Sequence, residues 1–190
     1  MKKAPLLAIL ALSFAVAGCS NVVTASRDKP IDDNRGTRTL GSTVDDALIE
    51  TKASVNISKA NADLASSHIV VVSYNGVVLI AGQTPRADLK AQAEQAVRSV
   101  QRVKTVHNEL QVTGNSSLLA RSNDSWLTTR IKTQMFADED IPGSRIKVVT
   151  ENGIVYLLGL VTQQEGAHAV QLIQSVSGVQ RIVKLFEYIN

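Results

Sequence analysis

Cysteine, surplus charge and long apolar runs are all scarce in this sequence, and each scarcity excludes a class of protein. The only cysteine among the 190 residues is Cys19, which excludes an internal disulfide and a cysteine-ligated metal cluster. Twenty basic side chains stand against 17 acidic ones, and two of the basic ones, Lys2 and Lys3, precede a predicted cleavage site. Because no basic stripe occurs, the sequence does not indicate a nucleic-acid partner.

Motifs of catalysis and metal binding are lacking as well. The three histidines, His68, His107 and His168, show no spacing typical of a metal site. Neither the Gly-x-Ser-x-Gly turn of a hydrolase nor a phosphate-binding glycine loop occurs. The acidic run 138–140 is interpreted as a solvated loop. We therefore expect a protein that is not an enzyme, with no cofactor, no metal site and no small-molecule substrate.

An apolar segment near the N-terminus predicts secretion and lipid attachment. Residues 4–17 follow Lys2 and Lys3, and about 14 residues are too few for a membrane-spanning helix, which needs roughly 20. The segment ends in Val-Ala-Gly-Cys, which resembles a bacterial lipobox. This resemblance implies removal of residues 1–18 and acylation of Cys19; the alternative is an ordinary signal peptide with an incidental thiol. By the sorting rule of such lipoproteins, Ser20 implies the outer membrane, with the protein on its periplasmic face.

A hairpin pattern occurs twice in the sequence. Residues 69–82 and 145–159 each place Asn-Gly between two largely apolar runs and end in glycine. Asn-Gly accepts the positive backbone angles of a tight turn between two twisted strands. The spacing of about 77 residues exceeds the roughly 20 to 50 residues of a solenoid unit. The sequence therefore predicts two tandem copies of one small domain.

Both copies predict the same order of elements, which is helix, strand, strand, helix, strand. In the first copy we expect Ser42 or Thr43 to cap the first helix, Thr84-Pro85 to start the second helix, and residues 103–112 to form the last strand. In the second copy Thr162 opens a capping box. The predicted fold class is α+β, with a three-stranded mixed sheet packed by two helices in each domain.

The two first helices share an apolar face and an acidic residue. Side chains at steps of four form the inward face in each copy, and Asp46, interpreted as an acid at a helix N-terminus, corresponds to Asp124. The inward residues are Ile49, Ala53 and Ile57 in the first copy and Leu127, Ile131 and Met135 in the second. The predicted boundaries are a signal peptide at 1–18, a lipidated flexible linker at 19–41, domains at 42–113 and 121–190, and a second linker at 114–120.

The repeated unit resembles the BON domain. That family combines a hairpin with a turn glycine and a closing glycine, an alanine-rich helix, and Val-x-Gly-Val before a final strand. Residues 176–179 fit this last motif, whereas the first copy has Arg102 where the glycine is expected, which leaves its turn geometry open. The resemblance covers about 42–190, nearly the whole mature chain.

The lipobox, the short linker and two such domains together resemble the dual-BON-domain outer-membrane lipoproteins, and residues 122–129 are similar to the start of their second domain. The resemblance implies a protein enriched at division sites that supports envelope integrity. It also implies that the first helix of the second domain binds anionic phospholipid.

The residues of that helix suggest how such binding works. At about 100° per residue, Trp126 and Thr133 lie opposite the inward face, with Thr129 and Arg130 adjacent. An indole prefers the headgroup region of a bilayer, and a nearby basic side chain contributes about 1 kcal/mol toward an anionic surface. Arg121 is a further basic residue nearby. The predicted phospholipid-binding residues are Trp126, Leu127, Thr129, Arg130, Lys132 and Thr133.

Two alternatives remain open for this helix face. Trp126 can pack against the first domain, where Leu48 and Val55 occupy the corresponding outward positions. The face can also bind an envelope assembly protein, which would make the chain an interaction adaptor.

Overall fold

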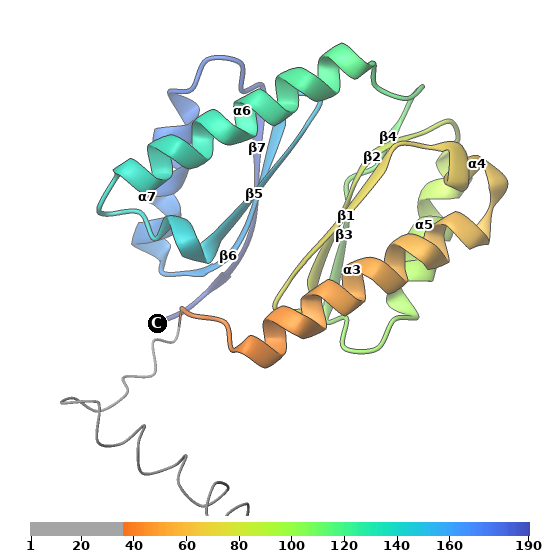
Figure 1. Cartoon of the computed structure of the whole chain (residues 1–190), viewed down its shortest axis with the longest axis horizontal. Helices are drawn as coiled ribbons and strands as arrows, with labels where there is room; N and C mark the ends of the chain where they lie inside the picture. The colour runs from red at the N-terminus through yellow and green to blue at the C-terminus, as the bar shows by residue number, and fades with distance from the viewer. Residues whose placement is uncertain (1–35) are drawn as a thin grey trace, which may run out of the picture. The chain divides into compact units, whose positions relative to one another are not determined.

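The computed structural model describes residues 36–190 (Figure 1), which belong to one structural unit. The predicted signal peptide, Cys19 and the linker up to residue 35 lie outside the described residues.

The order of elements predicted for each copy is confirmed, with a short extra helix, α4, in the first and a 3₁₀ turn, η1, in the second. The first copy comprises α3 (Leu40–Ala60), α4 (Ala62–Ser66), β1 (Ile69–Tyr74), β2 (Val77–Thr84), α5 (Ala87–Arg98), β3 (Thr105–Asn108) and β4 (Gln111–Val112). The second comprises α6 (Leu118–Ala137), η1 (Gly143–Arg145), β5 (Ile146–Glu151), β6 (Ile154–Val161), α7 (Gln163–Gln174) and β7 (Arg181–Tyr188).

Each copy builds a mixed sheet around the second strand of its hairpin, as predicted, but the sheet of the first copy has four strands instead of the predicted three, while that of the second has three. Strand β2 pairs antiparallel with β1 and parallel with β3 and β4, and β6 pairs antiparallel with β5 and parallel with β7. The predicted strand at 103–112 is interrupted between β3 and β4. There the Asn108 side chain accepts a hydrogen bond from the Leu110 amide at 3.4 Å, and Leu110 turns into the core. This local bond competes with the regular ladder.

The Asn-Gly turns have the backbone geometry that the sequence predicts. Asn75 and Gly76 have φ of 53° and 81°, and Asn152 and Gly153 have φ of 51° and 73°. A methyl group added at Gly76 would lie 2.7 Å from the carbonyl oxygen of Arg102, so only glycine fits there. Both hairpins are therefore closed by tight turns with positive backbone angles.

Two predicted helix starts are wrong. Helix α3 begins earlier, at Leu40, because the extended residue Thr39 accepts the capping hydrogen bond from the Ser42 amide. Helix α5 begins after Arg86 and has no side-chain cap. Thr84 cannot serve as that cap because it is the last residue of β2 and pairs with Val112.

The helices of the second copy begin where side chains can cap them. The capping box predicted at Thr162 is confirmed, since the Thr162 hydroxyl accepts from the Glu165 amide at 3.2 Å and the Glu165 carboxylate accepts from the Thr162 amide at 2.8 Å. Helix α6 is capped by Ser117 and begins at Leu118, so the last three residues of the predicted linker 114–120 are helical.

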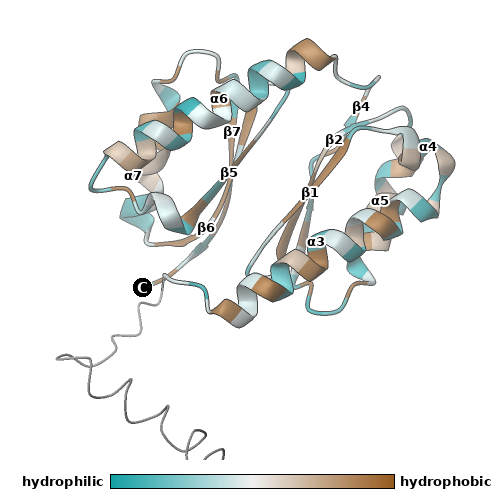
Figure 2. Cartoon of the chain, viewed as in Figure 1, coloured by the Kyte–Doolittle hydropathy of each residue, from teal (hydrophilic) through white to brown (hydrophobic). Residues whose placement is uncertain are grey.

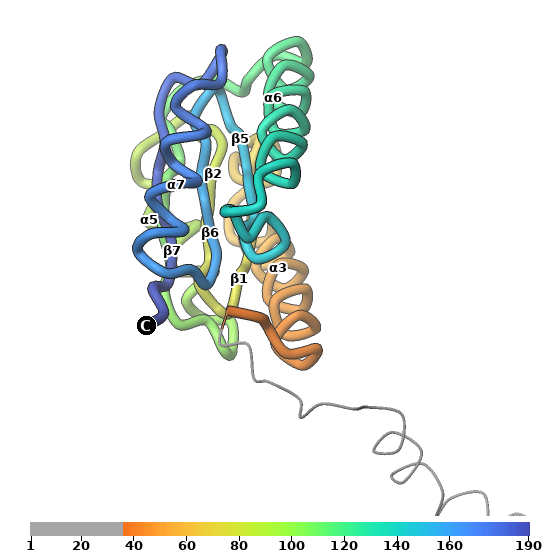
Figure 3. The backbone as a smooth tube through the Cα atoms, turned by 90° about the vertical axis from the view of Figure 1, so that its left-hand side faces the viewer, coloured from red at the N-terminus to blue at the C-terminus, as the bar shows by residue number. Residues whose placement is uncertain are grey.

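Three apolar clusters hold residues 36–190 together. One lies between the helices and the sheet of the first copy and one at the same place in the second, and all the inward positions predicted for the two first helices belong to them. Figure 2 shows apolar residues gathered along the strands, and Figure 3 shows the helices from the side. The third cluster joins the other faces of the two sheets and contains Val72, Tyr74, Val77, Leu79, Ala81, Ile154, Tyr156, Leu158 and Leu185.

Polar contacts also connect the two copies. The Lys147 ammonium lies 2.7 Å from a Glu50 carboxylate oxygen, and the Asn75 amide donates to Glu187 at 2.9 Å. The His68 ring nitrogen lies 3.3 Å from Glu151. Since the shared apolar cluster and these contacts involve both sheets, the two BON-like copies support one another.

Candidate functional site

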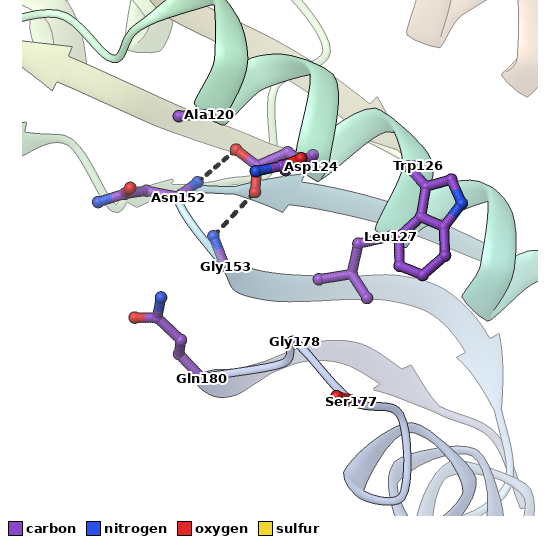
Figure 4. Close-up of a pocket in the computed structure, with 10 residues that line it drawn as sticks. Ala120, Asp124, Trp126, Leu127, Asn152, Gly153, Ser177, Gly178 and Gln180 are labelled. Atoms are coloured by element: carbon purple, nitrogen blue, oxygen red, sulfur yellow. Dashed lines mark hydrogen bonds between the residues drawn. The ribbon is translucent and has the colours of Figure 1, made fainter.

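Helix α6 is fixed to its hairpin by a buried carboxylate. The two oxygens of Asp124 accept hydrogen bonds from the backbone amides of Asn152 and Gly153, at 2.7 and 2.9 Å (Figure 4). Only 7% of Asp124 is exposed. The interpretation of this position as an acid at a helix N-terminus is therefore wrong, because it binds the hairpin turn instead and so fixes which face of α6 points outward.

Asp46 has the same role in the first copy and makes more contacts. It accepts from the amides of Asn75 and Gly76, and also from the Ser73 hydroxyl and the Arg38 guanidinium, each at 2.7 Å. Burial alone would raise the pKa of Asp46, but these hydrogen bonds outweigh it, so the pKa of this carboxyl is lowered. Asp46 is thus held ionised in the folded protein.

Trp126 projects from the outer face of α6. The residue is 61% exposed, and the Arg130 guanidinium carbon lies 5.4 Å from the centroid of its ring, within the range of a cation–π contact. Thr129, Lys132 and Thr133 are exposed on the same helix. The structure therefore brings together five of the six residues predicted for phospholipid binding.

Leu127 and Arg121 lie elsewhere. Leu127 is only 5% exposed and belongs to the apolar cluster of the second copy, as its spacing with Ile131 requires, so its side chain is not part of the outer face. Arg121 is half-buried and lines a groove with His68 and Glu151, and its Nε atom is buried without a hydrogen-bond partner. Arg121 is therefore not one of the basic residues beside the indole.

Sequence reasoning missed three apolar residues on α6. Leu118 and Leu119 at its start and Phe136 at its end are exposed by 78%, 72% and 66%. The helical projection that placed Trp126 also puts these three on the outer half, within about 80° of the indole. Extending that projection over the full length of the helix would have found them.

The alternative in which Trp126 packs against the first domain is wrong. The cluster shared by the two sheets contains neither Trp126 nor Leu48. Leu48 and Val55, which occupy the corresponding face of α3, are themselves half-exposed. Both first helices therefore carry an outward apolar face, and that of α6 alone combines it with an indole.

A hollow of about 310 Å³ lies beside Trp126, between α6, the hairpin turn and the turn before β7 (Figure 4). Its lining is mostly uncharged and polar, with the side chains of Asn123, Asn152, Ser177 and Gln180 around Gly178. The first copy has a similar hollow of about 360 Å³. There Asp45 stands in place of Asn123 and Arg102 in place of Gly178, and these two side chains form an ion pair.

Comparison with known proteins identifies the two copies. The BON domain family matches residues 45–114 and 123–190. The chain therefore belongs to the BON-domain family. Each match includes most of a first helix, the hairpin and the turn that Asp46 or Asp124 binds.

Relatives that match most of the chain include three named proteins. The outer membrane lipoprotein DolP of Haemophilus influenzae is 39% identical over 153 residues, which are 80% of this chain and 79% of that protein. The 21 kDa hemolysin of Actinobacillus pleuropneumoniae is 31% identical over 162 residues, 85% of this chain and 81% of that protein. The osmotically-inducible protein Y of Escherichia coli is 29% identical over 149 residues, 75% of this chain and 72% of that protein. Within residues 36–190, no helix is both long and apolar enough to span a bilayer.

Proposed function

We propose that this protein is an outer-membrane lipoprotein, anchored through Cys19, whose helix α6 binds anionic phospholipid and which supports envelope integrity at division sites. The relative named as an outer membrane lipoprotein and the lipobox-like sequence before Cys19 support the anchor. The proposal assigns the protein to the periplasmic face of the membrane and assigns it no chemical reaction.

The observation that carries the lipid proposal is the exposed Trp126 ring with Arg130 over it. A helix of 20 residues is about 30 Å long, and its exposed apolar residues stand at both ends and near the middle. Such a helix can lie flat on a bilayer, with the indole among the headgroups. Arg130 and Lys132 then each contribute about 1 kcal/mol toward an anionic surface.

The test uses the untagged fragment 20–190 and two sets of vesicles. Titration with anionic vesicles should shift the Trp126 emission to the blue, because the ring leaves water, and neutral vesicles should not. The double variant W126A/R130A should bind anionic vesicles about tenfold or more weakly by sedimentation, since the loss of roughly 1.4 kcal/mol is tenfold.

The first copy provides a matched control for this experiment. Leu48 and Lys52 occupy in α3 the positions of Trp126 and Arg130 in α6, and both are exposed. The variant L48A/K52A should therefore bind anionic vesicles like the unchanged fragment. Equal binding by W126A/R130A and the unchanged fragment would refute the lipid proposal.

The same exposed face also fits an adaptor that binds an envelope assembly protein. The outward leucines at the start of α6 favour this second candidate, because protein partners recognise exposed apolar patches as well. A Trp126 emission that is unaffected by either kind of vesicle would favour the adaptor.

A further inference from the structure

Three side chains with metal-ligand chemistry meet where α6 ends. Asp138 and Asp140 lie in the loop after α6, and His168 projects from α7. One ligand atom from each of the three lies within 4.8 Å of the other two. The residues are separated by about 30 positions in the sequence, so the spacing of the histidines alone could not reveal the cluster.

The charge around these residues favours a cation. Asp138, Glu139 and Asp140 are consecutive acids, and within residues 36–190 no Lys or Arg side chain lies within ion-pair distance of Asp138 or Asp140. Within the same residues, His168 is the one side chain within ion-pair distance of Asp138. A bound divalent cation would neutralise the excess negative charge.

The geometry suits a small metal ion. The Nε2 atom of His168 lies 3.4 Å from an Oδ2 atom of Asp138, which is longer than an ordinary N–H···O hydrogen bond. Two ligands of a tetrahedral ion with bonds of about 2.0–2.1 Å are themselves about 3.3 Å apart. The other oxygen of Asp138 accepts from the Asp140 amide at 3.0 Å, which orients the carboxylate and leaves Oδ2 toward the histidine.

We propose that Asp138, Asp140 and His168 bind a divalent transition-metal ion of the Zn²⁺ type. One imidazole nitrogen with two carboxylate oxygens suits such ions, whereas Ca²⁺ and Mg²⁺ prefer oxygen ligands throughout. Water completes the coordination, because the cluster is partly exposed. The bound ion ties the loop after α6 to α7.

The test is calorimetric titration of the untagged fragment 20–190, freed of metal by a chelator, with ZnCl₂ and separately with MgCl₂. The fragment lacks Cys19, so the thiol cannot supply the binding. We expect one Zn²⁺ per chain, weaker binding of Mg²⁺, and a melting temperature that rises with Zn²⁺ concentration, because an ion bound only by the folded state stabilises it.

Three variants decide whether the proposed ligands are responsible. H168Q and D140N should each weaken Zn²⁺ binding at least tenfold, because the loss of a group that merely orients a ligand already costs about 10- to 100-fold. D138N should also weaken Zn²⁺ binding at least tenfold, although the side-chain oxygen of the new residue can still accept the hydrogen bond from the Asp140 backbone amide. H107Q, which changes a histidine on β3, should leave binding unchanged.

The outcome does not depend on the lipid proposal, because no membrane is present. Zn²⁺ binding of undiminished strength in H168Q and D140N would overturn the metal proposal, and so would the absence of binding at millimolar Zn²⁺. Circular dichroism of each variant identifies a loss of binding that comes from unfolding. If H168Q unfolds, the isosteric variants D140N and D138N decide.

Discussion

Arg102 and Gly178 occupy the same turn in the two copies, and both adopt left-handed backbone angles, with φ of 70° and 104°. The turn geometry that the sequence left open is therefore the same in both. A left-handed conformation costs a residue with a side chain roughly 1–2 kcal/mol. The first copy carries this cost at Arg102, while the exposed ion pair of Arg102 with Asp45 offsets little of it.

Exchanging the residue types at these turns should change the stability in opposite directions. R102G should raise the free energy of unfolding by about 0.5 kcal/mol, since relief of the backbone cost exceeds the added freedom of glycine in the unfolded chain. G178A should lower it by about 1 kcal/mol. A methyl group at Gly178 has room, with the nearest atoms of Leu127 at 3.7 and 3.8 Å, so backbone strain alone is responsible.

Urea unfolding of the fragment 20–190 measures both changes. The variant D45A shows how much the ion pair contributes and should alter the stability by less than about 0.5 kcal/mol. A destabilised R102G would mean that the Arg102 side chain has contacts that outweigh its backbone cost.

Individual residues also differ in how far the sequence predicts their contacts. The inward positions of the first helices followed from their spacing because a helix repeats its faces locally. The role of Asp46 and Asp124 did not, since each accepts hydrogen bonds from a turn 28 to 30 residues further along the chain. Only the packed structure reveals that contact.

At the scale of elements, α6 combines a buried face with a long exposed apolar one. Its buried face could be predicted from apolar spacing, and Trp126 from the opposite side of the same projection. The same projection, extended to the end of the helix, also places Phe136 on this exposed side. By contrast, the break between β3 and β4 depends on a hydrogen bond of the Asn108 side chain. The alternation of apolar residues does not predict such a bond.

Phe136 allows a test of the whole exposed face rather than of the indole alone. F136S should weaken binding to anionic vesicles about fivefold, because a side chain that contributes roughly 1 kcal/mol at the interface is lost. Its unfolding midpoint should hardly change, since the ring is mostly exposed. Sedimentation with vesicles and thermal unfolding provide the two measurements.

The control for F136S is V55S, which alters an exposed apolar residue of α3. It should leave vesicle binding unchanged. If both variants weaken binding equally, the lipid surface extends over both first helices, and α6 has no special role.

At the scale of the whole described molecule, Glu151 links the two copies and makes their stability depend on pH. Its Oε1 atom lies 3.3 Å from His68 of the first copy, and its Oε2 atom is buried without a partner. Burial raises the pKa of Glu151, and the nearby Asp124 carboxylate adds to this, while His68 and Gln83 oppose it. Because the pKa is raised in the folded state, the contribution of Glu151 to stability is fully present below the unfolded pKa of about 4.3 and is lost as the pH rises through the folded value.

The variant E151Q should therefore be more stable than the unchanged fragment at pH 7, and the difference should vanish near pH 4. Thermal unfolding between pH 4 and 8 measures it. A variant that is less stable than the unchanged fragment at every pH would show that the contact with His68 outweighs the cost of burial.

Glu165 supplies a control of opposite sign. Burial alone would raise its pKa, but the Thr162 amide and Arg145 outweigh burial and lower it. Its stabilising effect is thus present at neutral pH and lost as the pH falls through the lowered value. E165Q should be less stable than the unchanged fragment at pH 7, with the difference shrinking in acid.

The duplication could be predicted from the two Asn-Gly hairpins, whereas the contact between the copies could not. The strands of a sheet buried on both faces read as continuous apolar runs, which do not say what covers each face. In the structure, the positions Val77, Leu79 and Ala81 of the first copy and Ile154, Tyr156 and Leu158 of the second belong to the shared cluster. These are equivalent positions of the repeated hairpin.

This equivalence gives the contact between the copies the character of a two-fold interface. Both sheets offer the same strand positions to one another, as the subunits of a symmetric homodimer do. Because one chain carries both halves, their encounter is intramolecular and does not depend on the protein concentration.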